Sequence, residues 1–218
     1  AGPMHADPAM VSAAEMADRK AEFLALWADG SKVVLSHLDA KGDRPVPLAS
    51  LTFSPSYQSG GQQTGGTVES LAATAASDAY FVAVELAAQS AGSDPRVVLY
   101  RVGTDLANAQ PKRLFETPSA KTHAPSVTNV DGDPVLSYLH NVGDGSGGDA
   151  YRVMLARPSS GGSSSPKPTE LTDANLPAPA SRSGGERLRR PTYPEIVALE
   201  RASGYGDGVL VAWWDARD

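Results

Sequence analysis

One apolar pattern recurs four times along the chain and constrains the fold more than any other feature. It is a short apolar run, often containing an aromatic residue, at 23–27, 81–85, 135–139 and 210–214. The first three copies are followed by a loose turn bearing Gly or Asp and then by a second apolar run, at 33–38, 96–102 and 149–156. A strand, a turn and a second strand form an antiparallel hairpin. The recurrence of this hairpin therefore predicts a repeat architecture built from β-sheets.

Each repeat has room for four short strands, which is the arrangement of a propeller blade. The units lie at about 11–54, 68–118, 123–172 and 194–218, and the last is incomplete. The sequence thus predicts an all-β chain that forms an incomplete β-propeller of about three and a half four-stranded blades. Helix remains an alternative for 12–20, because Ala, Glu and Met favour helices and Ser12 and Glu15 have the spacing of a capping box.

Composition supports this class and excludes several functions. The chain of 218 residues contains 21 Gly and 17 Pro, so turns are frequent, and its hydrophobic share of 41% is enough for a packed core. The absence of Cys excludes disulfides, thiolate metal sites and cysteine nucleophiles. A net charge of −6 argues against a nucleic-acid partner, which requires a positive surface. No apolar run is long enough to predict a membrane-spanning helix.

The fourth unit has its second strand but no partner for that strand. Only 215–218 follow Trp213 and Trp214. A strand without a partner exposes a row of backbone donors and acceptors. We therefore expect another polypeptide segment, most simply a downstream cleavage product or a paired subunit, to complete the propeller. By the same argument, the chain alone is not expected to be an independently stable monomer.

A long stretch rich in Ser, Pro and Gly, at 157–193, separates the third and fourth units. Such a composition buries little apolar area, which is typical of a surface insertion between blades. A functional loop is the alternative, because long loops in compact domains are often functional. Its end concentrates arginines, so a carboxylate or phosphate ligand is possible there. The candidate ligand-binding residues in this stretch are Arg187, Arg189 and Arg190.

Closely spaced oxygen donors mark the turn inside the third unit. Asp144, Ser146 and Asp149 stand among glycines in this turn, a pattern that suits a hard cation such as Ca²⁺. Asp131 and Asp133 allow the same interpretation with less support. Asp and Gly are also ordinary residues of hairpin tips, so a plain turn is the alternative. The four His residues show no spacing that is typical of metal ligands.

The repeats resemble the bacterial sialidase-like β-propeller repeats. In that family, a strand of the type VAWWDARDG is followed by a short hairpin, and 211–218 of this chain read VAWWDARD. The segment LALWADG at 24–30, together with KVVLSHLDAKGD at 32–43, is similar to a whole such unit. The resemblance implies a propeller fold and an exported bacterial protein, secreted, periplasmic or at the cell surface. It does not imply a reaction.

The resemblance extends in outline to the arginines that hold a substrate carboxylate in sialidases. Arg190 with Pro191, and Asp215 with Arg217, are similar to the family's motifs. The motifs differ, however: no Ile stands between Arg190 and Pro191, and the chain contains no Ser-x-Asp-x-Gly-x-Thr-Trp box. We therefore expect a binding or assembly subunit without its own catalytic centre, with a glycan or an anion as a possible ligand. The alternative is a sialidase-type glycoside hydrolase fragment whose remaining site residues lie outside this chain.

The calcium hypothesis makes a direct prediction. If Asp144, Ser146 and Asp149 hold Ca²⁺, binding to the folded state will raise the melting temperature as Ca²⁺ is added. Thermal melts across a calcium titration, with Mg²⁺ as the control ion, measure this. An unchanged melting temperature at millimolar Ca²⁺ would contradict the hypothesis.

Overall fold

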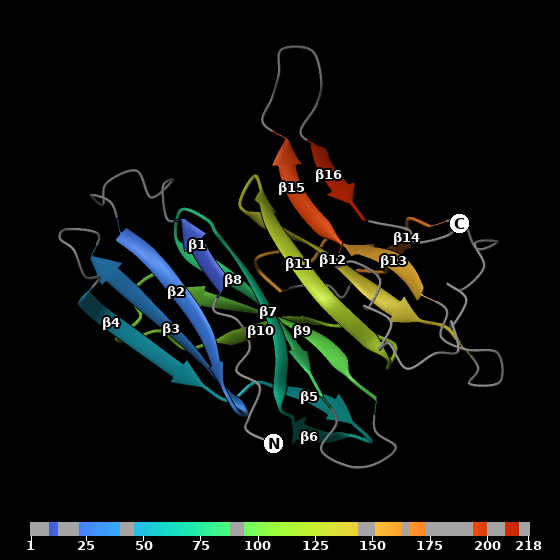
Figure 1. Cartoon of the computed structure of the whole chain (residues 1–218), viewed down its shortest axis with the longest axis horizontal. Coiled ribbons are helices and arrows are strands. Elements are labelled where there is room, and N and C mark those ends of the chain that lie inside the picture. The colour runs from blue at the N-terminus through green and yellow to red at the C-terminus, as the bar shows by residue number, and fades with distance from the viewer. Residues whose placement is uncertain are drawn as a thin grey trace, which may run out of the picture.

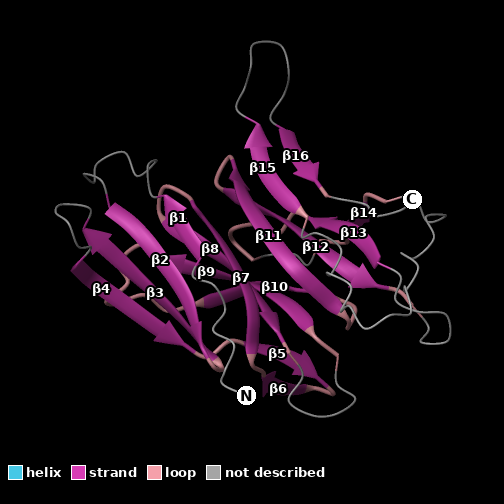
Figure 2. Ribbon diagram, viewed as in Figure 1, coloured by secondary structure: helices cyan, strands magenta, loops and turns pink. Residues whose placement is uncertain are grey.

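The computed structural model describes residues 9–12, 22–39, 46–87, 94–143, 151–162, 166–172, 194–199 and 208–213. These residues form sixteen β-strands and no helix (Figure 2). The prediction of an all-β chain is therefore confirmed. Within the same residues, no helix is long and apolar enough to cross a membrane.

Sheet one is an antiparallel sheet of four strands that follow one another in the chain. Its strands are β1 (Ala9–Ser12), β2 (Glu22–Asp29), β3 (Lys32–Asp39) and β4 (Val46–Phe53), in the order β1-β2-β3-β4. The turn between β2 and β3 has Gly30 at a φ of 61°, a conformation that costs glycine nothing. Alternate residues of β2, Leu24 and Leu26, are fully buried.

Sheets two and three repeat this arrangement. Sheet two has the order β10-β9-β8-β7 and sheet three the order β11-β12-β13-β14. Sheet two contains β7 (Val68–Ala75), β8 (Ala79–Leu86), β9 (Arg96–Gly103) and β10 (Lys112–Glu116). Sheet three contains β11 (Thr122–Val130), β12 (Asp133–Asn141), β13 (Tyr151–Ala156) and β14 (Thr169–Glu170).

Two antiparallel hairpins complete the described strands. The first, β5 (Ser56–Ser59) with β6 (Gln62–Gly65), lies between sheets one and two in the sequence. The second, β15 (Glu195–Leu199) with β16 (Gly208–Ala212), follows sheet three. None of the sheets closes on itself.

The sheets contact one another in the order in which they occur in the sequence. Strand β7 contacts β1 and β2, β11 contacts β7 and β8, and β15 contacts β11. Figure 1 shows the sheets spreading apart from this line of first strands, with β4 and β16 on opposite sides of the molecule. Each sheet therefore packs on the sheet before it mainly through its own first strand.

Sheet two has its core on both faces. All eight residues of β8 are buried. Tyr80, Val82, Val84 and Leu86 pack in one cluster with Leu24, Leu26 and Leu35 of sheet one. Phe81 and Ala83 pack in a second cluster with Leu136 and Tyr138 of sheet three. Because successive side chains of a strand point to opposite faces, neighbouring residues of β8 serve different interfaces.

The predicted strands that lie within the described residues agree with the structure, except that β16 ends at Ala212 within the predicted run 210–214 and that two further differences occur. The helix alternative for 12–20 is wrong at Ser12, which belongs to β1, while 13–21 lie outside the described residues. Hairpin β5–β6 was not predicted, because its strands are polar and show no apolar alternation. Its turn contains Gly60 and Gly61 at φ of 57° and 82°, which is the combination that a tight two-residue hairpin turn requires.

Gly66 provides a test of the packing between the residue that follows β6 and the residue that follows β8. A Cβ at this position would collide with the carbonyl oxygen of Ala87, which is a backbone atom and cannot rotate away. We expect Gly66→Ala to lower the free energy of unfolding by about 1–3 kcal/mol. Urea denaturation measures the change. Gly103→Ala is the matched control, because its Cβ would meet only the Ala109 side chain at 3.9 Å. Equal stability of the two variants would contradict the packing.

Candidate functional site

The ligand-binding residues that were predicted from the sequence lie outside the described residues. This holds for Arg187, Arg189 and Arg190 of the insertion and for Asp215 and Arg217 after β16. It also holds for the predicted calcium ligands Asp144, Ser146 and Asp149. Their roles stay predictions.

The two other acidic residues considered as cation ligands belong to a hairpin turn. Asp131 and Gly132 connect β11 to β12 with φ of 53° and 87°, as a tight hairpin turn requires. The Asp133 carboxylate accepts a hydrogen bond of 2.8 Å from the Ser160 amide, and hydrogen bonding with Ser160 lowers the pKa of Asp133. In the part of the chain that the structure describes, no group of three or more His, Asp or Glu residues is arranged to hold a metal ion. Asp131 and Asp133 thus lie at a hairpin turn, and a cation role for them stays a prediction.

A fully buried carboxylate lies between sheets two and three. Glu85 of β8 has no exposed surface. It accepts hydrogen bonds from the Ser70 hydroxyl at 2.7 Å and from the Ala124 amide at 3.0 Å, and His123 Nδ1 lies 2.9 Å from its other oxygen. Burial raises the pKa of Glu85, but the hydrogen bonds from His123, the Ala124 amide and Ser70 outweigh it and hold the pKa below its usual range.

The backbone of sheet three is irregular where it contacts this carboxylate. The pairing of β11 with β12 shifts register between His123 and Ser126, and Ala124 adopts a φ of 51°. A positive φ is unfavourable for alanine, so the bond from the Ala124 amide to Glu85 is one interaction that compensates for it. The His123 ring also packs edge-on against Tyr151, with 6.1 Å between ring centroids.

Ser70, His123 and Glu85 do not form a catalytic triad despite their residue types. In a triad the serine donates to the histidine, which removes its proton, and the carboxylate orients the histidine. Here the Ser70 hydroxyl donates directly to the Glu85 carboxylate rather than to His123, so the order of a triad is not met. A similar buried contact joins sheets one and two, where His37 Nε2 lies 2.8 Å from the Tyr80 hydroxyl. These contacts connect sheets rather than activate a nucleophile.

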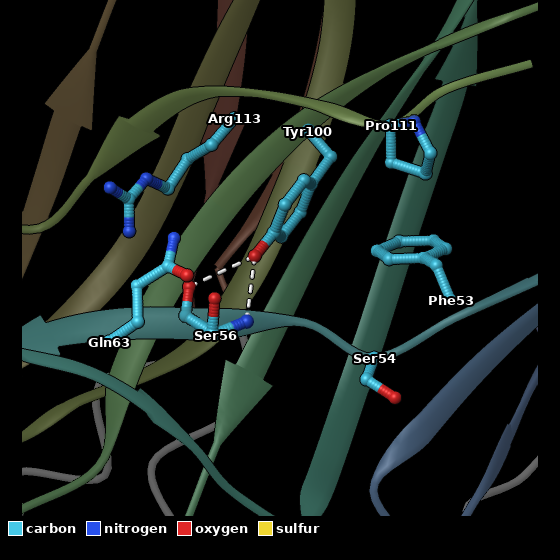
Figure 3. Close-up of a pocket in the computed structure, with 7 residues that line it drawn as sticks. All are labelled: Phe53, Ser54, Ser56, Gln63, Tyr100, Pro111 and Arg113. Atoms are coloured by element: carbon cyan, nitrogen blue, oxygen red, sulfur yellow. Dashed lines mark hydrogen bonds between the residues drawn. The ribbon is translucent and has the colours of Figure 1, made fainter.

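An open groove of about 410 Å³ lies between sheets one and two beside the hairpin β5–β6 (Figure 3). Its lining residues come from β4, the hairpin, β9 and β10: Phe53, Ser54, Ser56, Gln63, Tyr100, Pro111 and Arg113. The Tyr100 hydroxyl donates to the Ser56 carbonyl at 2.9 Å and accepts from the Ser56 amide at 2.8 Å. These two hydrogen bonds between the Tyr100 side chain and the Ser56 backbone fix the hairpin on sheet two.

Glu116 organises the charges near the groove. Its carboxylate accepts from the Gln58 amide at 3.0 and 2.9 Å, and it pairs with Arg113 at 3.1 Å and Arg96 at 3.4 Å. Two arginines thus share one carboxylate. The Arg96 guanidinium also lies 5.9 Å from the ring centroid of the buried Tyr57. Of the seven residues that line the groove, Arg113 is the charged one.

The hairpin β15–β16 exposes an apolar face. Ile196 is buried, and the amides of Ile196 and Ala198 donate to the hydroxyls of Ser126 and Thr128 on β11. The alternate residues Val197 and Leu199 are 57% and 50% exposed, and Leu210, which pairs with Val197, is 56% exposed. One face of the hairpin therefore packs on sheet three, while the other presents large apolar side chains to solvent.

The groove could not have been found from the sequence. Its residues come from five strands and their connections, spread from Phe53 to Arg113, and none belongs to a recognised motif. For the exposed face of β15–β16, the sequence showed only the apolar pattern of EIVALE and GVLVAWW and not its exposure. No protein-family model, no curated protein and no solved structure matches this chain.

The Glu85 contacts predict a pH dependence of stability. Because the pKa of Glu85 is below its unfolded value of 4.5, its contribution is fully present above about pH 4.5 and is lost as the pH falls through the lower folded value. We expect Glu85→Ala to cost about 3 kcal/mol at pH 7, because it leaves the Ala124 amide without its acceptor. Urea denaturation between pH 7 and pH 3 measures both effects.

Glu85→Gln separates charge from shape in the same experiment. It keeps the volume but removes the titrating group, so stability should fall less steeply in acid than in the wild type. Asp78→Asn is the control, because Asp78 pairs with Arg101 on the surface. Identical acid profiles for the wild type and Glu85→Gln would show that Glu85 does not contribute.

Proposed function

We propose that this chain is an exported β-propeller subunit for binding or assembly, without a catalytic centre of its own, and that a further polypeptide segment completes its propeller. Two observations support the proposal: the repeated four-stranded sheets and the resemblance to sialidase-like repeats. Under the proposal, sheets one to three are blades and the hairpin β15–β16 is the inner half of a fourth. Export follows from the resemblance alone.

The observation that carries the proposal is the exposed apolar face of β15–β16. In position along the repeat, β16 corresponds to β8 and β12. Strand β8 is buried along its whole length, and six residues of β12, from 134 to 139, are buried. None of the five residues of β16 is buried. A blade that follows β15–β16 and packs on Val197, Leu199 and Leu210 would restore the burial that the other two strands have.

The opposite end of the stack also carries apolar side chains, which are less exposed than those of β15–β16. In sheet one, Leu26 and Leu35 point toward sheet two, so their neighbours Trp27 and Val34 point away from it. Trp27 and Val34 pair across the strands and are only partly buried. A ring of blades covers both ends of such a stack, which is how propellers avoid exposed apolar faces. The partner that fits is therefore itself a β-sheet with an apolar face.

Self-association of the chain tests this proposal. An apolar face without its partner favours association, so sedimentation velocity should show a weight-average mass that rises with concentration. The double variant Val197→Lys with Leu210→Lys should sediment as a monomer at concentrations where the wild type associates. The reason is that two charges on the face oppose its burial.

The matched control adds two lysines elsewhere. Gln62→Lys with Gln110→Lys places the same charge at exposed polar positions away from the hairpin, and this variant should associate like the wild type. A wild type that remains monomeric at all concentrations and melts cooperatively would contradict the proposal. Equal association of both double variants would show that the face is not the contact.

A further inference from the structure

We propose that the groove between sheets one and two binds a small carboxylate that carries an apolar group, with Arg113 as the residue that holds the carboxylate. This binding site goes beyond the proposed function and does not depend on the blade count.

Two side chains at one end of the groove have hydrogen-bond donors that the described residues do not use. Arg113 uses Nη1 to pair with Glu116, and its Nε and Nη2 make no hydrogen bond to the described residues. The side-chain amide of Gln63 likewise makes no hydrogen bond within the described part of the chain. Figure 3 shows the ends of Arg113 and Gln63 on the same side of Tyr100, while Phe53 and Pro111 lie on the other side. The groove therefore has one polar end and one apolar end.

The charge at the polar end is positive. Arg96 and Arg113 share the single carboxylate of Glu116, so the three side chains carry a net charge of about +1. Glu116 is also bonded to the Gln58 amide, which keeps it in place. None of the seven lining residues is acidic. A guanidinium with free donors beside a neutralised carboxylate favours an anion with two oxygens, which can accept a bidentate pair.

The apolar end is fixed before any ligand binds. Phe53 packs edge-on against Tyr100 at 5.1 Å between ring centroids, which joins sheet one to sheet two. Burial raises the pKa of Tyr100, so its hydroxyl stays neutral and bonded to Ser56. A wall that is already ordered lowers the entropy cost of binding. An aromatic or aliphatic group that lies against Phe53 and Pro111 would lose contact with water there.

The size of the groove limits the ligand. A volume of about 410 Å³ is near the lower end of the range that small-molecule sites occupy. It has room for one ring with a short substituent rather than for a polymer. N-acetylphenylalanine has the required chemistry, a carboxylate next to one apolar ring, and it serves as the probe.

Titration calorimetry with matched probes tests the site. N-acetylphenylalanine should bind the wild type saturably with a millimolar dissociation constant, and its neutral amide should bind at least about tenfold more weakly because it lacks the charge that pairs with Arg113. Arg113→Gln should weaken binding of the acid by about tenfold and leave binding of the amide unchanged. Arg113→Lys keeps the charge but not the planar fork, so its effect should be intermediate.

Two controls make the result decisive. Arg101→Gln removes an arginine of the same sheet that pairs with Asp78 outside the groove, and it should bind the acid within about twofold of the wild type. Amide-proton NMR shifts upon addition of the acid should be confined to residues around Phe53, Gln63 and Arg113. Acid and amide that bind the wild type equally, or shifts that lie elsewhere, would overturn the proposal without the use of any variant. Absence of saturation up to about 20 mM acid would do the same.

Discussion

The burial of β8 on both of its faces is the constraint on which the rest of the structure depends. A strand with water on one side alternates apolar and polar residues, whereas AYFVAVEL is apolar at seven of its eight positions and is buried throughout. Such a strand is stable only when a second sheet covers each face. Sheet two therefore requires sheets one and three, and the sheets must stack in series. The sheets at both ends of the stack likewise need a further sheet to cover their outer faces.

Polar contacts fix how the sheets stack. Each interface of sheet two contains one buried polar group from β8, the Tyr80 hydroxyl toward His37 and the Glu85 carboxylate toward His123. Apolar surfaces alone tolerate small sliding, but a displaced sheet would leave these groups buried without their partners. The six residues from Tyr80 to Glu85 thus contribute to both packing energy and alignment. The positive φ of Ala124 is a local cost that accompanies this alignment.

The apolar runs were sufficient to predict these strands, because a strand that is buried on one or both faces is rich in apolar residues. The runs 23–27, 81–85 and 135–139 fall inside β2, β8 and β12 as the structure has them. Hairpin β5–β6 left no such trace, since it is held by Tyr100 and Glu116, which lie more than forty residues away in the sequence. The groove and the Glu85 contacts were missed for the same reason. Long-range contacts between polar residues carry no periodic signal that one sequence can show.

The two proposed binding surfaces arise from the same stacking that builds the fold. The groove exists because β5–β6 lies across the junction of sheets one and two, and the apolar face exists because β15–β16 packs on sheet three with only one side. The first feature suits a small ligand and the second suits another sheet. Neither requires a catalytic residue, which is consistent with a binding or assembly role.

Hydrogen exchange of the backbone amides, followed by NMR on the isolated chain, tests serial stacking most directly. Protection reports the free energy that exposes each amide, and strands covered on both faces open only when the domain unfolds. Serial stacking predicts that amides in β8 and β9 exchange most slowly and that amides in β15 and β16 exchange orders of magnitude faster. Protection in β16 equal to that in β8 would contradict the account, because the hairpin would then be as well covered as the centre of the stack.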